Sequence, residues 1–292
     1  MKNIIFYFPL LFVIVLYAQD DSYQKVKYPP TYQGQLNITY TQIDDWNGTF
    51  DLYRPQNTKN PTPLIIDIHG GGWIHGVKES HWEFEPFFNM NWAVANIEYR
   101  VAGQAPAPSA IEDVRCALIY LIKNSRELNI NPNKIVLMGN SAGGHLALMA
   151  GLLGNDHIFD KNCPDFDSIQ IFAIIDKYGP VDLRNPKKLG TKSVLTWVKE
   201  KVINPKFMNS ISPITYVTKN SPPVFIVHGD ADPTVPYSQS VALNQELENF
   251  GVVHQFFTVK DGGHGQFSPE DTKKIDDSII EFLTGLGLNK PQ

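Results

Sequence analysis

The sequence predicts an α/β fold with a mostly parallel central sheet, helices on both of its faces and a small cap insertion. Three observations support this prediction. Short, continuously apolar segments alternate with segments of helical length, as they do in parallel sheets with crossover helices. Glycine-rich or polar loops follow several apolar segments directly, and ligands bind at the carboxyl ends of parallel strands. The chain has 292 residues, 42% of them hydrophobic, which is enough for one large core.

The elements follow one another in a regular order. Residues 36–42 and 49–54 alternate in polarity and predict an antiparallel pair with its turn at Asn47 and Gly48. The further predicted strands are residues 64–68, 92–98, 135–138, 171–177, 224–227 and 255–259. The predicted helices are residues 82–90, 110–124, 142–153, 237–250 and 271–283. Residues 182–209 interrupt this order with one helical piece, 194–202, and could form a cap over the site or a long connection.

The first residues have the pattern of a secretory signal peptide. Lys2 precedes a short apolar run that ends at the small residue Ala18, and two acidic residues follow Gln19. The run is short for a membrane span, so an uncleaved anchor is the disfavoured alternative. We expect cleavage near Ala18 or Gln19, one domain over residues 20–292, a secreted or periplasmic location and no stable membrane insertion. The formal net charge of −5 and the absence of a Lys/Arg run argue against a nucleic-acid partner.

Cysteines and acidic clusters predict little chemistry. Cys116 lies in a helical pattern and Cys163 in a polar loop. Export would permit a disulfide, but a helical cysteine is more often a small core residue, so we favour two unpaired cysteines. One loop carries four acidic residues, Asp156, Asp160, Asp165 and Asp167. Their spacing matches no EF-hand, so we expect a solvated loop and no metal site, and no cofactor motif is present.

Residues 139–143, Gly-Asn-Ser-Ala-Gly, give the strongest functional signal. They lie between a predicted strand and a predicted helix, which is the context of a nucleophile elbow. Glycines on both sides allow the tight turn that exposes the Ser141 hydroxyl. The helix that follows begins with unpaired N–H groups that can stabilise an oxyanion. The alternative is an ordinary glycine-rich turn, which the strand–turn–helix context disfavours.

Residues 69–73, His-Gly-Gly-Gly-Trp, follow a predicted strand directly. Consecutive glycines let N–H groups point into a cleft, so we predict that Gly71, Gly72 and Ala142 form an oxyanion hole. Trp73 is predicted to bound a short acyl pocket and thus to contact substrate. A loop that is merely flexible is the disfavoured alternative, because glycine runs are entropically costly.

A carboxylate and a histidine complete the predicted triad. Asp230 and Asp232 both follow the strand 224–227, and Asp232 is preferred because it lies further out on the turn. Either aspartate could instead be an Asx-turn residue. His264 lies between glycines on a loop after the last predicted strand, where it can reach a site.

The order Ser141, Asp232, His264 is the order of the triad in α/β-hydrolases. The chain resembles the hormone-sensitive-lipase-like group of α/β-hydrolase serine esterases and, within it, secreted bacterial acetyl-xylan and feruloyl esterases. The residues that carry the resemblance are 69–73, Tyr99, Arg100, 139–145, 178–182, 228–236, Gly263 and His264. Many members of this group have an acidic residue where this chain has Asn140. The chain also lacks the large amino-terminal cap helices of many lipase relatives, which disfavours long lipid substrates.

The resemblance implies a secreted serine carboxylic-ester hydrolase that removes acetyl or feruloyl groups from plant or algal polysaccharide through an acyl-enzyme. The expected partner is an esterified carbohydrate or a small ester, and no cofactor is implied. The alternative is a general short-chain carboxylesterase or a formamidase acting on small molecules. A non-catalytic carbohydrate-binding module on the same fold is disfavoured, because such a module needs neither the triad nor the glycine loop.

Overall fold

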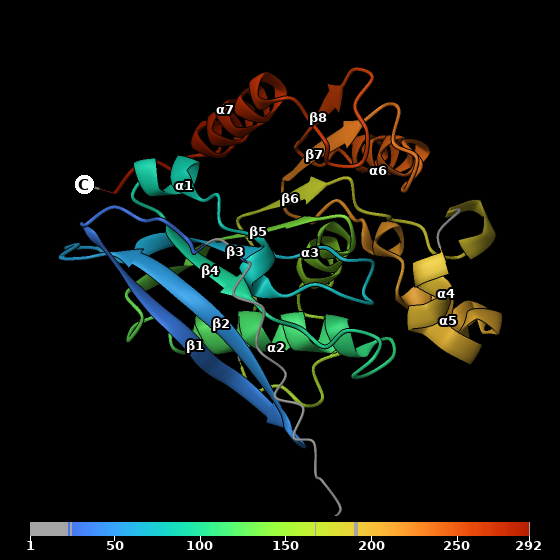
Figure 1. Cartoon of the computed structure of the whole chain (residues 1–292), viewed down its shortest axis with the longest axis horizontal. Coiled ribbons are helices and arrows are strands. Elements are labelled where there is room, and N and C mark those ends of the chain that lie inside the picture. The colour runs from blue at the N-terminus through green and yellow to red at the C-terminus, as the bar shows by residue number, and fades with distance from the viewer. Residues whose placement is uncertain (1–22, 24, 167, 190–191, 292) are drawn as a thin grey trace, which may run out of the picture.

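A computed structural model of the chain describes residues 23, 25–166, 168–189 and 192–291. Eight strands form one sheet in the order β1-β2-β4-β3-β5-β6-β7-β8 (Figure 1). Only the β1–β2 and β2–β4 pairs are antiparallel. The strands are β1 (Tyr32–Ile43), β2 (Trp46–Pro55), β3 (Thr62–Ile68), β4 (Ala93–Ile97), β5 (Ile130–Asn140), β6 (Ala173–Lys177), β7 (Val224–Gly229) and β8 (His254–Val259). The predicted signal peptide lies outside the described residues.

Two apolar cores lie on opposite faces of the sheet. Strand β3 shows why, because Leu64, Ile66 and Ile68 belong to one core and Ile65 to the other. Every residue of β3 and β4 is buried, as expected for central strands covered on both faces. The continuous apolar runs in the sequence therefore correspond to central strands of the sheet.

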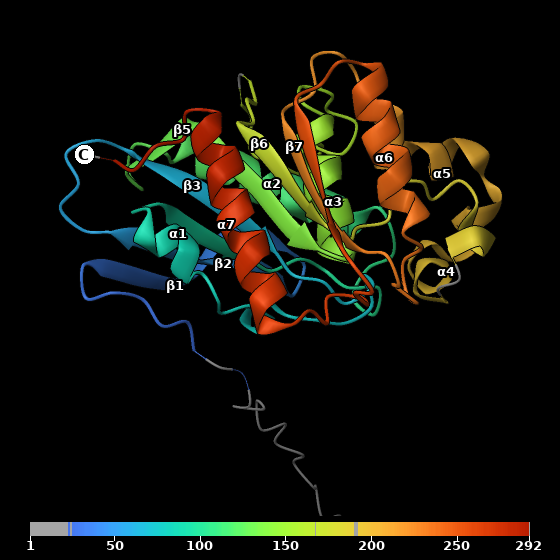
Figure 2. The ribbon, with the colours of Figure 1, turned by 90° about the horizontal axis from the view of Figure 1, so that it is seen from above.

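Helices cover both faces, so the predicted α/β-hydrolase architecture is confirmed. Helices α2 (Ser109–Lys123), α3 (Ala142–Leu152) and α6 (Ser238–Asn249) pack in one core. Helices α1 (Glu85–Asn89) and α7 (Pro269–Gly285) cover the opposite face (Figure 2). All residues of α3 are buried, which explains why it has no polar stripe. None of the helices in the described part of the chain is both long and apolar enough to cross a bilayer.

The segment that interrupts the alternation lies between β6 and β7. It contains helices α4 (Lys192–Val198) and α5 (Pro205–Ser210) and 3-10 turns at Pro186–Leu189, Lys199–Ile203 and Pro213–Tyr216. Both helices lie at one side of the molecule, to the right of α3 in Figure 1. A further 3-10 turn, Lys78–Ser80, follows the glycine loop.

The position of the first hairpin turn differs from the prediction. Ile43 pairs with Trp46, so Asp44 and Asp45 form the turn, and Asn47 and Gly48 lie in β2. Asp44 adopts a φ of 50°, a left-handed conformation that Asp tolerates better than most residues. The predicted helix over residues 82–90 is also shorter, since α1 contains only Glu85–Asn89.

The prediction of unpaired cysteines is wrong, because Cys116 on α2 and Cys163 form a disulfide. Arg115, next to Cys116, holds the loop that carries Cys163 against α2 through an ion pair. Its guanidinium is fully buried and donates to both carboxylate oxygens of Asp160, at 2.8 and 2.5 Å. Asp160 is therefore an internal ion-pair partner rather than a solvated loop residue. A buried arginine without this partner would be strongly unfavourable, so the pair fixes the loop against α2.

We expect the double substitution Cys116→Ala/Cys163→Ala to lower the free energy of unfolding by about 2–4 kcal/mol. The disulfide closes a loop over a sequence separation of 47, and its loss restores chain entropy to the unfolded state. Urea unfolding of the oxidised wild type and the variant measures the loss. Reduction of the wild type should reproduce it, and an unchanged urea midpoint after reduction would contradict the prediction.

Candidate active site

The proposed nucleophile lies on a strained turn between β5 and α3. Ser141 has φ 53° and ψ −120°, and its N–H donates to the Lys177 carbonyl at 2.8 Å. A Cβ atom on Gly139 would lie 2.3 Å from Gly143, and one on Gly143 would lie 2.0 Å from the Ile68 carbonyl oxygen. These glycines are required by close approach of the backbone, as the Gly-x-Ser-x-Gly pattern predicts.

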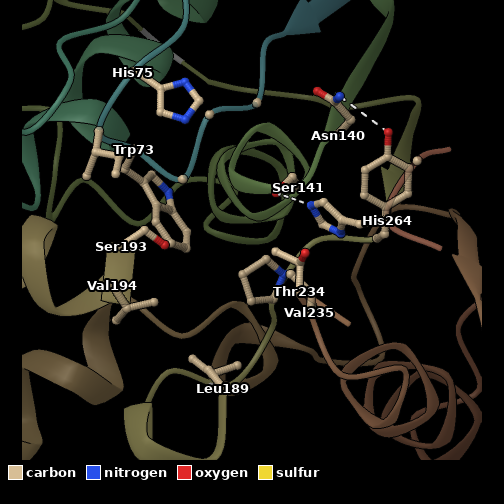
Figure 3. A pocket seen from close by; sticks show the side chains of 17 residues that line it. Trp73, His75, Asn140, Ser141, Leu189, Ser193, Val194, Thr234, Val235 and His264 are labelled. Carbon is tan, nitrogen blue, oxygen red and sulfur yellow. Dashed lines mark hydrogen bonds between the residues drawn. The ribbon is translucent and has the colours of Figure 1, made fainter. Parts of the chain in front are cut away.

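The structure brings Ser141, His264 and Asp232 into one hydrogen-bonded series, and Figure 3 shows its Ser141–His264 hydrogen bond. The Ser141 hydroxyl lies 2.8 Å from His264 Nε2, and His264 Nδ1 lies 2.6 Å from Asp232 Oδ2. His264 comes from the loop after β8 and Asp232 from the loop after β7. In this arrangement the carboxylate orients the imidazole, and the imidazole can accept the serine proton.

Four hydrogen bonds hold the Asp232 carboxylate. Oδ1 accepts from the Thr234 and Val235 N–H groups at 2.7 and 3.0 Å, and Oδ2 accepts from both His264 and His228. Burial alone would raise the pKa of Asp232, but the hydrogen bonds from both histidines and from the backbone outweigh burial and lower this pKa. Asp232 therefore stays ionised over the pH range in which esterases work.

His228 is a partner of the triad carboxylate that the sequence analysis treated only as the end of a strand. It is fully buried, and its Nε2–H donates to Asp232 Oδ2 at 3.1 Å and to the Val235 carbonyl at 3.0 Å. Its Nδ1 accepts from the Ser240 hydroxyl at 2.7 Å, which fixes the tautomer. The His-Gly-Asp-x-Asp spacing was the available signal, because it places a histidine four residues before the aspartate.

Asp230 occupies a different environment. Its Oδ2 accepts from Lys260 at 3.0 Å and its Oδ1 from the Asp261 N–H at 2.6 Å, at the surface. The structure thus brings Asp232, and not Asp230, to His264. Asp230 joins the loops that follow β7 and β8.

The glycine loop lies beside the Ser141 turn. Gly71 and Gly72 have φ values of 114° and 61°, and a Cβ atom on Gly71 would lie 1.9 Å from the His75 carbonyl oxygen. Both glycines line the cavity that contains Ser141. Ala142 begins helix α3, so its N–H has no intrahelical acceptor and is available to an oxyanion.

Aromatic packing fixes the glycine loop in place. The Trp73 indole is only 2% exposed, stacks on Trp197 at 4.8 Å and donates to His145 Nδ1 at 3.3 Å. His145 in turn donates from Nε2 to the Ile211 carbonyl at 2.8 Å, and burial lowers its pKa to about 4. The neutral His145 ring therefore joins the glycine loop, helix α3 and the segment that carries α4 and α5. Trp73 borders the cavity, but most of its surface is packed in the core, and its contact with substrate stays a prediction.

The cavity at Ser141 has a volume of about 460 Å³. Besides the glycine loop and the triad, it is lined by Asn140, Tyr178, Leu189, Ser193, Val194 and Val235. Leu189 and Val194 lie on the side of the cavity away from Asn140 (Figure 3). Among the described residues no group of three or more His, Cys, Asp or Glu side chains could hold a metal ion.

Residues 50–247, more than half of the chain, match the BD-FAE family. The chain belongs to the BD-FAE family. Residues 207–291 also match a second family, described as TAP-like protein. The two matches together span the triad, the glycine loop and the segment between β6 and β7.

This BD-FAE family member is similar to esterases and to a carbohydrate esterase. Esterase LipC and Esterase LipQ of Mycobacterium tuberculosis are each 28% identical to it, over 70% and 76% of the chain. The chain covers 53% and 55% of these relatives, about half of their length. A truncated form of a carbohydrate esterase from gut microbiota has a TM-score of 0.78 at 29% identity, over 89% of this chain and 100% of that one.

A buried acid near the Ser141 turn of this BD-FAE family member was not predicted from the sequence. Asp176 on β6 is fully buried, and its Oδ1 accepts from the Gly179 N–H at 2.9 Å. Its Oδ2 is buried without a hydrogen-bond partner among the described residues. Burial raises the pKa of Asp176 from 3.8 to about 8, although the Gly179 hydrogen bond lowers it. Asp176 is thus largely protonated at neutral pH.

We expect Asp176→Asn to stabilise the protein more at pH 8 than at pH 5, by roughly 2–4 kcal/mol. The unfolded state loses the Asp176 proton near pH 4, whereas the native state keeps it to about pH 8. Wild-type stability therefore falls between these pH values, and the isosteric amide removes this loss. Urea unfolding of both proteins at both pH values measures the effect, and an equal difference at pH 5 and pH 8 would exclude it.

Proposed function

We propose that this chain is a secreted serine carboxylic-ester hydrolase that removes acetyl or feruloyl groups from plant or algal polysaccharide. One observation carries the catalytic part of the proposal, which is the Ser141–His264–Asp232 series beside the glycine loop. These parts together suit ester hydrolysis through an acyl-enzyme.

In the proposed reaction, Ser141 Oγ attacks the ester carbonyl while His264 Nε2 accepts the hydroxyl proton. The N–H groups of Gly71, Gly72 and Ala142 stabilise the tetrahedral oxyanion. His264 then protonates the departing alcohol, and the acyl group remains on Ser141. Water, activated by His264, attacks the acyl-enzyme and releases the acid. The negative charge of ionised Asp232 stabilises the imidazolium in both steps. Hydrogen bonds from two backbone N–H groups hold this carboxylate in position.

Two findings support the substrate and location. The similarity to a carbohydrate esterase extends over 89% of the chain, which favours an acylated sugar over other esters. The Cys116–Cys163 disulfide favours an oxidising compartment such as the periplasm or the extracellular space. Under this proposal, residues 1–19 direct export and residues 20–292 form the mature catalytic domain.

We expect Asp232→Asn to lower kcat for p-nitrophenyl acetate by roughly 10³- to 10⁴-fold, because His264 loses the carboxylate that orients it. Ser141→Ala should lower kcat by a similar or larger factor. The matched control is Asp230→Asn, which changes a surface carboxylate two residues away and should retain nearly wild-type turnover. Steady-state kinetics of the folded variants test the assignment, and a larger loss in Asp230→Asn than in Asp232→Asn would move the triad acid.

We also expect kcat/KM across p-nitrophenyl esters to peak between acetate and butyrate and to fall steeply by octanoate. The cavity side walls include Leu189 and Val194, and each methylene that they exclude costs about 1–3 kcal/mol. Leu189→Ala should move the optimum to longer chains, whereas Trp73→Ala should mainly destabilise the core.

The substrate class is tested in parallel with acetylated xylan, methyl ferulate and N-formylkynurenine. Release of acetate or ferulate supports the polysaccharide-ester proposal, and a preference for N-formylkynurenine would favour a formamidase. A wild-type optimum at octanoate or longer would instead indicate a lipase.

A further inference from the structure

A second cavity of about 220 Å³ lies next to the ester site. Asn140 and Tyr178 line both cavities, and Asn140 Nδ2 donates to the Tyr178 hydroxyl at 3.3 Å, so this pair separates them. Because Asn140 directly precedes Ser141, the second cavity begins one residue from the proposed nucleophile. Pockets for drug-sized ligands measure roughly 300–1,000 Å³, so this smaller cavity suits a single small ring.

A hydrogen-bonded Asp–His pair lines the second cavity. His81 Nδ1 donates to Asp67 Oδ2 at 2.6 Å, and the Asp67 side chain is 3% exposed. Asn96 Nδ2 donates to the His81 carbonyl at 3.1 Å, which also fixes the backbone. Burial lowers the pKa of His81, but the Asp67 carboxylate outweighs burial and raises it. The Asp67 carboxylate therefore holds the ring at Nδ1, and the Asn140 side chain also lies close enough to His81 to raise the pKa of the ring.

Two further polar groups in this cavity lack protein partners. The Lys177 amine makes no hydrogen bond or ion pair to any residue that the structure describes, and Lys177 lines the cavity together with His81. Asn140 Oδ1 is buried, again without a hydrogen-bond partner in the described part of the chain. The cavity thus presents the Lys177 amine as a hydrogen-bond donor, and His81 and Asn140 add further polar groups to its lining.

Aromatic side chains supply the apolar part of the lining. Trp82 is partly exposed and Phe84 is buried, and both line the cavity. A sugar ring combines hydroxyl groups on its rim with CH groups on its face, which match mixed donors and acceptors beside an indole. A purely apolar ligand would leave Lys177 desolvated without a partner, and an anion would meet the carboxylate of Glu83.

We propose that the second cavity is a subsite for one neutral sugar ring next to the acylated sugar. The identity of that ring as part of the substrate chain rests on the proposed function, whereas binding of the ring itself does not. The subsite would position the polysaccharide so that its ester group reaches Ser141.

The test uses the full-length Ser141→Ala protein, which cannot turn over a substrate through Ser141. Isothermal titration with xylotetraose, cellotetraose and mannotetraose measures binding before and after Trp82→Ala or Lys177→Met. We expect at least one tetrasaccharide to bind, and each change to weaken that binding by about tenfold. The matched controls are Trp46→Ala, whose indole lies against Arg100, and Lys273→Met on the exposed face of α7. Both controls should leave the dissociation constant within about twofold.

The outcomes distinguish the subsite from the proposed function. No binding of any tetrasaccharide, or equal weakening by the controls, overturns the subsite. Activity is measured in proteins that keep Ser141. There, Trp82→Ala and Lys177→Met should each lower the ratio of kcat/KM for acetylated xylan to kcat/KM for p-nitrophenyl acetate. Deacetylation of xylan with an unchanged ratio would overturn the subsite alone. Sugar binding that depends on Trp82, without release of acetate from xylan or of ferulate from methyl ferulate, would overturn the proposed function alone.

Discussion

Strands β3 and β5 and helix α3 meet at Gly139 and Gly143 with no side chain between them. A Cβ atom at either glycine would lie about 2 Å from backbone, so this contact exists only with glycine. The contact brings the residues after Ile68, which form the glycine loop, beside the first turn of α3. It also holds Ser141 at a φ of 53°, a conformation that costs about 1–3 kcal/mol. Burial of α3 on all sides offsets that strain.

Side chains that do not touch the reacting atoms keep these backbone elements in place. Trp73 and His145 join the glycine loop to α3, and Trp197 joins both to the segment carrying α4. On the opposite side of the site, His228 shares Asp232 Oδ2 with His264. Trp73, His145 and His228 are buried and hydrogen-bonded in one arrangement, so the donors and the carboxylate are oriented before substrate arrives. Such preorganisation is what makes electrostatic stabilisation of an oxyanion effective.

The sequence predicts the parts of this molecule that depend on local pattern. Buried parallel strands and the turn at Ser141 are local features, and the structure contains them close to the predicted bounds. Contacts between distant residues leave a weaker signal. The sequence around Cys116 does not indicate that Arg115 pairs with Asp160. That ion pair holds the loop against α2, and the same loop carries Cys163, which bonds to Cys116. The hairpin turn was misplaced because Asp44-Asp45 and Asn47-Gly48 both suit turns, and only the pairing of β1 with β2 selects between them.

Asn140 shows how a neutral side chain serves both cavities. Many esterases of the group that this chain resembles have an acidic residue before the nucleophile, and such a charge would repel the oxyanion that develops at Ser141. It would also add a second negative charge near Asp67, whose carboxylate is already matched by His81. The amide instead donates to the Tyr178 hydroxyl. The Tyr178 and His264 rings pack edge to face, with their centroids 4.9 Å apart. Asn140 therefore supports the imidazole through Tyr178 and lines both cavities without placing a charge beside the nucleophile.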